Sequence, residues 1–171
     1  MTTAIRTLDE LLAHADALER EAVERYEELA DQMAVHNQPE VAELFRNMAA
    51  IEGQHVNKVT ELAVGRELPR LAPWEYRWPT LEAPESVPVG QGHYRMNVRQ
   101  ALELMLACEE RARDFFAEVV RDCPDPAARA TAATLAADEQ RHAQLLREWL
   151  TRYPELSTIW QVDMDEPTAQ E

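Results

Sequence analysis

Glycine and cysteine are both scarce in this sequence of 171 residues, with 4 and 2 copies respectively. The shortage of glycine, together with plentiful Ala, Leu, Glu and Arg, favours an all-helical domain, because these four residues are good helix formers. Cys108 and Cys123 do not form a Cys-x-x-Cys pair. A disulfide framework is therefore not expected, and the composition favours a reducing compartment.

Long apolar runs and positive charge are also lacking. The N-terminal segment has no apolar stretch of the kind found in signal peptides, and no run approaches the ~20 residues that span a bilayer. The sequence has 17 basic and 32 acidic residues, which gives a net charge of -15. This charge argues against nucleic acid and anionic membranes as partners. We expect a soluble, cytoplasmic protein with a single core.

Apolar residues recur with a helical period in four segments, which predicts four helices. Capping residues and prolines set the expected limits of these helices: Thr7 to about His36, Pro39 to about Gly65, Asn97 to about Cys123, and Asp125-Pro126 to just before Pro154. His14 and His36 are predicted to face solvent. The acidic tail, 154–171, has no helical period.

Residues 66–96 interrupt the helical pattern with five prolines. Trp74, Tyr76 and Trp78 make the segment too apolar for a free linker. We therefore expect an ordered crossover along the bundle, long enough to join two parallel helices. These aromatic residues, with Ile159 and Trp160 of the tail, also suggest a surface that is covered in a homodimer.

Two halves of the chain repeat one pattern of glutamate and histidine. Glu-x-x-His occurs at Glu52–His55 and again at Glu139–His142. Residues three apart share one face of a helix, so each pair can point into the core. Upstream of each pair is a Glu followed by Ala three residues later and an aromatic residue seven residues later: Glu19, Ala22 and Tyr26 in the first half, and Glu109, Ala112 and Phe116 in the second.

Four glutamates and two histidines thus lie on core-facing stripes of four helices. Burying carboxylates without compensation is costly, and bound cations are the simplest compensation. Helical bundles that bind two iron or manganese ions use this ligand set. We expect two iron ions, with manganese as the alternative. Glu52 and Glu139 would bridge the metals, and Glu19 and Glu109 would be terminal. The open alternative is a bundle that keeps the spacing without the metal.

These motifs resemble the rubrerythrin branch of the ferritin-like superfamily, over residues 8–152. The resemblance implies that residues 1–153 form a ferritin-like four-helix bundle, with a long crossover between its second and third helices. It also implies a non-haem di-iron site that reacts with hydrogen peroxide or dioxygen. Rubrerythrins have a further Glu three residues after the third-helix ligand, where this chain has Ala112. The site is therefore expected to be more symmetric, and the family's rubredoxin domain is missing.

The expected function is that of a di-iron oxidoreductase that reduces peroxide or oxygen. Its electrons would come from a separate donor protein or a small reductant. Tyr26 and Asp138 are candidates to hydrogen-bond the metal ligands. Two alternatives remain open: a ferroxidase that oxidises and passes on Fe(II), and a non-enzymatic helical scaffold with a vestigial site.

Overall fold

The computed structural model of the chain describes residues 5–80, 82–87, 92–93 and 95–153. Over these residues the chain is all-α, as its composition predicts. Its elements are α1 (Leu8–Val35), α2 (Pro39–Leu62), the short 3-10 helix η1 (Pro73–Glu75), α3 (Val98–Asp122) and α4 (Pro126–Leu150). The acidic tail, with Ile159 and Trp160, lies outside the described residues.

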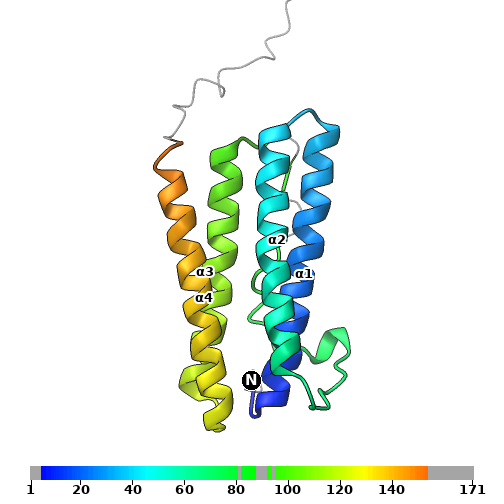
Figure 1. Cartoon of the computed structure of the whole chain (residues 1–171), viewed down its shortest axis with the longest axis vertical. Helices are drawn as coiled ribbons and strands as arrows, with labels where there is room; N and C mark the ends of the chain where they lie inside the picture. Colours follow the sequence, from blue (N-terminus) through cyan, green and yellow to red (C-terminus); the bar gives the residue numbers. More distant parts are fainter. Residues whose placement is uncertain (1–4, 81, 88–91, 94, 154–171) are drawn as a thin grey trace, which may run out of the picture.

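The four long helices form two antiparallel hairpins that lie side by side, α1 with α2 and α3 with α4 (Figure 1). The crossover after α2 returns along the length of the bundle before α3 begins. As a result, α2 and α3 run in the same direction, which a short turn could not achieve. The sequence prediction of a crossover between parallel helices is confirmed.

Local sequence explains where the helices begin and end. Thr7 caps α1 by accepting a hydrogen bond from the backbone N–H of Glu10, at 3.2 Å. Asn97 and Gln100 form a reciprocal capping box at the start of α3, with N···O distances of 2.9 and 3.0 Å. Asn37, which follows the last turn of α1, has a φ of 56° that suits an asparagine between two helices. The predicted helix limits agree with the observed ones to within a few residues.

Asp125 caps α4 and also joins the two hairpins. One of its carboxylate oxygens accepts from the backbone N–H of Ala127 at 2.8 Å. The other accepts from the backbone N–H of Leu8, at the start of α1, at 2.9 Å. These hydrogen bonds lower the pKa of Asp125, because they stabilise the carboxylate form.

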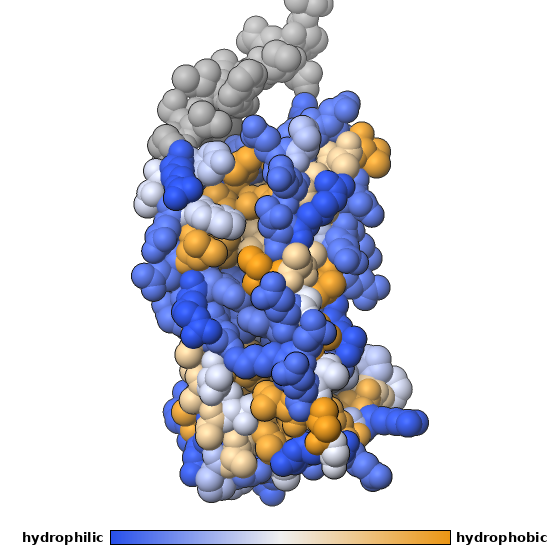
Figure 2. Space-filling model, viewed as in Figure 1, coloured by the Kyte–Doolittle hydropathy of each residue, from blue (hydrophilic) through white to orange (hydrophobic). Residues whose placement is uncertain are grey.

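The buried core consists of two apolar clusters. The first contains Tyr26, Phe45 and Met105, and the second contains Leu18 and Phe116. Along each helix, the residues of one cluster precede the glutamates and histidines of the repeat, and those of the other follow them. The bundle therefore has a polar layer between two apolar ends. The surface in Figure 2 is hydrophilic across the middle of the face shown, with apolar patches above and below.

The crossover packs against the bundle through aromatic side chains. Tyr76 and Trp78 stack on each other at 5.1 Å between ring centroids, and both contact the ring of His14 on α1. The prediction that His14 faces solvent is therefore wrong, since its exposed fraction is 1%. Its Nδ1 lies 2.7 Å from the carbonyl oxygen of Glu10, and its Nε2 accepts from the backbone N–H of Arg77 at 3.1 Å. His14 thus ties the crossover to α1.

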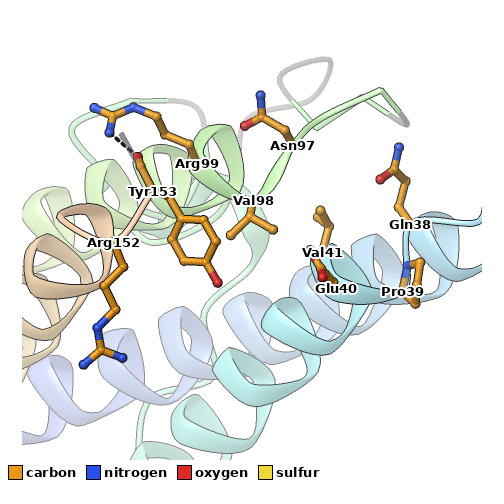
Figure 3. A pocket seen from close by; sticks show the side chains of 9 residues that line it. All are labelled: Gln38, Pro39, Glu40, Val41, Asn97, Val98, Arg99, Arg152 and Tyr153. Carbon is orange, nitrogen blue, oxygen red and sulfur yellow. Dashed lines mark hydrogen bonds between the residues drawn. The ribbon is translucent and has the colours of Figure 1, made fainter. Parts of the chain in front are cut away.

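A cleft of about 460 Å³ lies at the other end of the bundle, where the first turns of α2 and α3 meet the end of α4 (Figure 3). Val41, Val98 and Tyr153 give it an apolar wall, and the Arg99 guanidinium donates to the Tyr153 carbonyl at its edge at 2.6 Å. None of the glutamates and histidines of the repeat lines this cleft.

No helix among the described residues is both long enough and apolar enough to span a bilayer.

Candidate metal centre

The polar layer brings together all six residues that the repeat singles out. Each hairpin contributes one glutamate from its first helix and a Glu-x-x-His pair from its second. The glutamates Glu19, Glu52, Glu109 and Glu139 are completely buried, with exposed fractions of 0%. The helical stripes explain this position, because the residue one turn before each glutamate is apolar or small and buried. The residue one turn after it is a buried alanine in α1 and α3, and the histidine of the Glu-x-x-His pair in α2 and α4.

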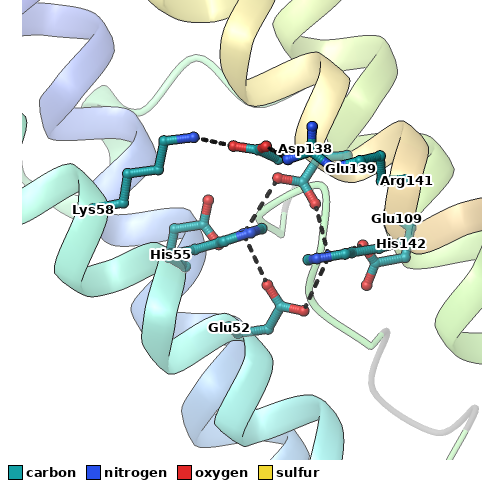
Figure 4. Close-up of polar contacts among 9 residues, drawn as sticks. Glu52, His55, Lys58, Glu109, Asp138, Glu139, Arg141 and His142 are labelled. Atoms are coloured by element: carbon teal, nitrogen blue, oxygen red, sulfur yellow. Dashed lines mark hydrogen bonds and ion pairs between the residues drawn. The ribbon is translucent and has the colours of Figure 1, made fainter. Parts of the chain in front are cut away.

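His55 lies among three carboxylates. Its Nδ1 is 3.4 Å from a Glu19 oxygen, 3.3 Å from a Glu52 oxygen and 3.5 Å from a Glu139 oxygen (Figure 4). Glu19 and Glu52 come from the same hairpin as His55, whereas Glu139 comes from the other. The second hairpin therefore reaches across the centre with one carboxylate.

His142 has the matching environment in the second half of the chain. Its Nδ1 is 3.3 Å from a Glu109 oxygen, 3.8 Å from a Glu139 oxygen and 4.0 Å from a Glu52 oxygen. Glu52 and Glu139 thus lie beside both histidines, while Glu19 and Glu109 each lie beside one. Two carboxylates are therefore shared by the histidines, and one further carboxylate lies beside each histidine.

The polar atoms of this layer lack ordinary partners. All eight oxygens of the four glutamates, and the Nδ1 atoms of both histidines, are buried without a hydrogen-bond partner among the described residues. Buried polar groups are normally paired, and leaving so many unpaired would be strongly destabilising. Ligand atoms of Glu52, His55, Glu139 and His142 lie within 4.8 Å of one another, close enough to share a cation. The donor set therefore fits a bound metal.

The cluster holds protons when no cation neutralises it. Burial raises the pKa of Glu19 to about 7, and it raises the pKa values of Glu109 and Glu139 well above their ordinary range. Burial opposes the charged form of His55, but Glu19 and Glu52 outweigh it and raise the His55 pKa to about 11. Burial lowers the pKa of His142, and a charged His55 nearby lowers it further. A metal ion must therefore displace protons to bind.

The structure adds a carboxylate that the sequence analysis missed. Glu85, in the crossover, is completely buried, and neither of its oxygens has a hydrogen-bond partner among the described residues. One of its oxygens lies within 4.8 Å of oxygens of Glu19 and Glu52. One of its oxygens also lies within 4.8 Å of oxygens of Glu109 and Glu139. No spacing rule could identify it, because the crossover has no helical period. Within the described part of the chain, the layer therefore contains five glutamates rather than four.

Among the described residues, Tyr26 and Asp138 form no hydrogen bond with the six residues of the repeat, and their expected role beside a bound metal stays a prediction. The Tyr26 ring packs on Phe45 at 6.0 Å between centroids, and its hydroxyl is buried without a hydrogen-bond partner among the described residues. Asp138 forms ion pairs with Lys58 on α2 and Arg141 on α4 (Figure 4). The pair with Lys58 joins the two hairpins beside the centre, and no hydrogen bond between Asp138 and either histidine is observed among the described residues.

The rubrerythrin family model matches residues 10–150, which is most of the chain and includes all six residues of the repeat. The chain belongs to the rubrerythrin family. An uncharacterised conserved protein from Magnetospirillum magnetotacticum MS-1, known from a crystal structure, is similar in sequence and in fold. The two share 39% identity with a TM-score of 0.69, over 88% of this chain and 98% of the other. No curated protein matches the chain significantly.

Family membership and geometry agree on the class of site. Rubrerythrins are ferritin-like bundles, and the observed four helices with a long crossover have that architecture. The family supports a di-iron protein, and the buried carboxylates and imidazoles form a cluster that could bind metal. Oxygen-rich ligands with two imidazoles suit iron better than structural zinc.

Proposed function

We propose that this chain is a non-haem di-iron oxidoreductase that reduces hydrogen peroxide or dioxygen. The observation that carries the proposal is the position of Glu52 and Glu139, whose carboxylates lie beside both histidines. Glu19 and His55 would hold one iron, and Glu109 and His142 the other. Glu52 and Glu139, which lie beside both histidines, would help to hold both ions.

A bound iron pair would supply one electron from each ion. These two electrons, with two protons from solvent, are what is needed to convert hydrogen peroxide to two waters, or dioxygen to hydrogen peroxide. The protein residues would balance the charge of the ions and keep water away from them. Four helix carboxylates balance the charge of two divalent ions. The apolar clusters on either side exclude water and competing donors. His55 and His142 are the partly exposed residues of the ligand set, with 10% and 19% of their side-chain surface exposed to solvent.

A ferroxidase is the second candidate, and the symmetry of the ligand set favours it. Each half of the repeat supplies an equivalent Glu-Glu-His triplet, and neither α1 nor α3 carries a further Glu one turn later, where Ala22 and Ala112 lie. In a ferroxidase the iron would be the substrate and would leave after oxidation. In a peroxide or oxygen reductase the iron would stay bound through repeated turnovers.

Metal analysis and rapid mixing test the proposal together. Protein purified without added metal should contain iron, with two ions per chain at full loading. The di-ferrous protein is then mixed with peroxide, and separately with air-saturated buffer, in a stopped-flow instrument. An oxidoreductase retains its iron and cycles when a reductant is added, whereas a ferroxidase releases Fe(III) and consumes fresh Fe(II). A wild-type chain that binds no iron would contradict both.

A further inference from the structure

Among the described residues, Glu85 is the one carboxylate of the polar layer that does not come from a helix. It lies in the crossover segment 82–87, which passes between α1 and α3. Its oxygens lie within 4.8 Å of Glu19 and Glu52 from one hairpin, and of Glu109 and Glu139 from the other. Glu85 therefore faces both halves of the centre at once.

The backbone on either side of Glu85 is fixed by one arginine. The Nε of Arg111 donates to the carbonyl oxygen of Pro84 at 2.8 Å, and its Nη2 donates to the carbonyl oxygen of Ser86 at 3.0 Å. The same Nη2 lies 3.2 Å from the Sγ of Cys108, one turn earlier on α3. The Arg111 guanidinium thus forms hydrogen bonds with the two peptide carbonyls that flank Glu85. Arg111 is on α3, the helix that also carries Glu109.

The neighbouring residues strengthen this placement. The Ser86 N–H donates to the Ala83 carbonyl at 3.0 Å, which closes a turn around Glu85, and the Nε of Arg25 on α1 approaches the Val87 carbonyl at 3.4 Å. Ala83 and Val87 are both buried. The segment is therefore docked between α1 and α3, and Glu85 cannot swing out to solvent without breaking these contacts.

Packing alone does not explain a glutamate at this position. A buried carboxyl with two unpaired oxygens is costly, and four other carboxylates beside it increase that cost. A glutamine or an apolar residue would fill the same volume without the charge. The position is explained if the carboxylate binds a cation, because a metal ion satisfies both oxygens and offsets the charge.

We propose that Glu85 is a fifth carboxylate ligand of the metal centre, delivered by the crossover, and that Arg111 is the residue that positions it. This inference rests on the proposed di-iron function. Four helix carboxylates balance two divalent ions, and Glu85 adds one further negative charge. That charge favours the ferric over the ferrous ions, so Glu85 lowers the reduction potential of the pair. Removing the charge, or releasing the segment that holds it, therefore raises the potential.

The test compares the full chain with Glu85→Gln, which keeps the volume and removes the charge. Glu82→Gln is the matched control, because Glu82 is on the same segment but is not among the carboxylates of the centre. Anaerobic calorimetric titration with Fe(II) should show two ions per wild-type chain. We expect Glu85→Gln to weaken binding of at least one ion roughly 10- to 100-fold, and Glu82→Gln to leave it unchanged. A redox titration should show a higher potential in Glu85→Gln only.

Arg111→Gln tests the positioning step independently, since Glu85 stays in the chain. We expect a potential shifted in the same direction as in Glu85→Gln, with a smaller loss of affinity. Equal affinity and equal potential in wild type and Glu85→Gln would overturn the inference while leaving the di-iron proposal intact. A wild-type chain that binds no Fe(II) would instead overturn the proposed function. If Glu85→Gln does not fold, the reduction potential of Arg111→Gln is the deciding measurement. A potential equal to that of the wild type would then refute the inference.

Discussion

The imidazole rings of His55 and His142 stack face to face, with centroids 4.7 Å apart and ring planes 9° from parallel. They come from equivalent positions in the two halves of the repeat, on α2 and α4. Two imidazolium ions could not stack at this distance without repulsion, so the pair favours neutral rings or a single charge. Neutral imidazoles with both Nδ1 atoms turned towards carboxylates are the form that binds metal.

The contacts of the glutamates predict unequal effects of removing them. Glu52→Ala should lower the iron content of both sites, because Glu52 lies beside His55 and His142. Glu19→Ala should affect one site only, because Glu19 lies beside His55 alone. Iron per chain, measured after anaerobic loading and desalting, should fall from two to near zero in Glu52→Ala and to about one in Glu19→Ala.

Glu139→Ala and Glu109→Ala repeat this comparison in the second half of the chain. Glu139 lies beside both histidines, whereas Glu109 lies beside His142 alone. Glu43→Ala, at an exposed position on α2, is the control that should bind two ions. Unchanged iron content in both Glu52→Ala and Glu139→Ala would refute the proposed site.

Metal removal should change both the stability and its pH dependence. In the metal-free protein burial raises the folded-state pKa of Glu19 to about 7, and it also raises the pKa values of Glu109 and Glu139 well above their ordinary range. The folded state therefore holds protons that the unfolded state has lost, and folding stability falls as pH rises from about 5 to about 8. Bound metal replaces these protons, so its stabilising effect grows over the same range.

Thermal melting of metal-free and iron-loaded protein at several pH values measures this effect. The difference in Tm between the two forms should widen as pH rises. Glu43→Ala should behave as wild type, and Glu52→Ala should show little difference between the two preparations. Metal-free protein that melts as high as the loaded protein at about pH 8 would contradict the expected linkage.

The helices and the six repeated residues could be predicted from sequence because a helix converts spacing into direction. Glu52 and His55, three apart, must share a face, and the apolar residues around them show that this face is buried. The repeat then placed Glu19, Glu109 and Glu139 in the same layer. All six do lie in that layer, although their role as ligands stays a prediction.

Glu85 and His14 show where this reasoning stops. The crossover has no regular period, so nothing in the sequence relates Glu85 to positions on the helices; only its place between Pro84 and Ser86 in an apolar stretch hints at burial. The helical pattern predicts that His14 faces solvent, although Leu11 and Leu18 place it at the edge of the apolar stripe. The side chains that cover it, Tyr76 and Trp78, come from the crossover, whose path the sequence does not give.

His14 should contribute to stability as a buried, neutral histidine. His14→Ala removes the hydrogen bond from the Arg77 N–H and leaves a gap beside Tyr76 and Trp78. We expect a loss of about 1–3 kcal/mol in the free energy of unfolding, measured by denaturant titration. Burial lowers the His14 pKa, so the unfolded state gains a proton first as pH falls below about 6.5, and this contribution weakens in acid. Glu27→Ala, at an exposed position on α1, is the control and should change stability little.

We expect the chain to form a homodimer through an apolar part of the crossover. Tyr76 and Trp78 pack on their own chain, but Trp74 in η1 is 84% exposed. Sedimentation velocity at micromolar concentration should show a dimer, and Trp74→Glu should shift it towards monomer. Val35→Glu makes the same change at an exposed position at the end of α1 and should leave the dimer intact. A wild-type monomer would rule out the dimer.

Electron supply should limit the isolated chain to a single turnover. An oxidised iron pair must be reduced again before it can react a second time, and the chain has no visible relay for that step. Cys108 and Cys123 are its only cysteines, both free and buried, and two thiols are too few for a four-cysteine iron site. We therefore expect the donor to be a separate protein or a small reductant. Di-ferrous protein mixed with peroxide or oxygen should give one rapid phase in the stopped-flow trace and then stop. Adding a reductase system should restore cycling.

The choice of oxidant is a separate expectation. Because the two Glu-Glu-His triplets are equivalent and Ala112 stands on α3, we expect a weaker preference for peroxide over oxygen than in rubrerythrins that have the further glutamate. Glu43→Ala should react as the wild type does. If the di-ferrous protein is inert to both oxidants over minutes, the chain is not an oxidoreductase, and a metal-binding or scaffold role takes its place.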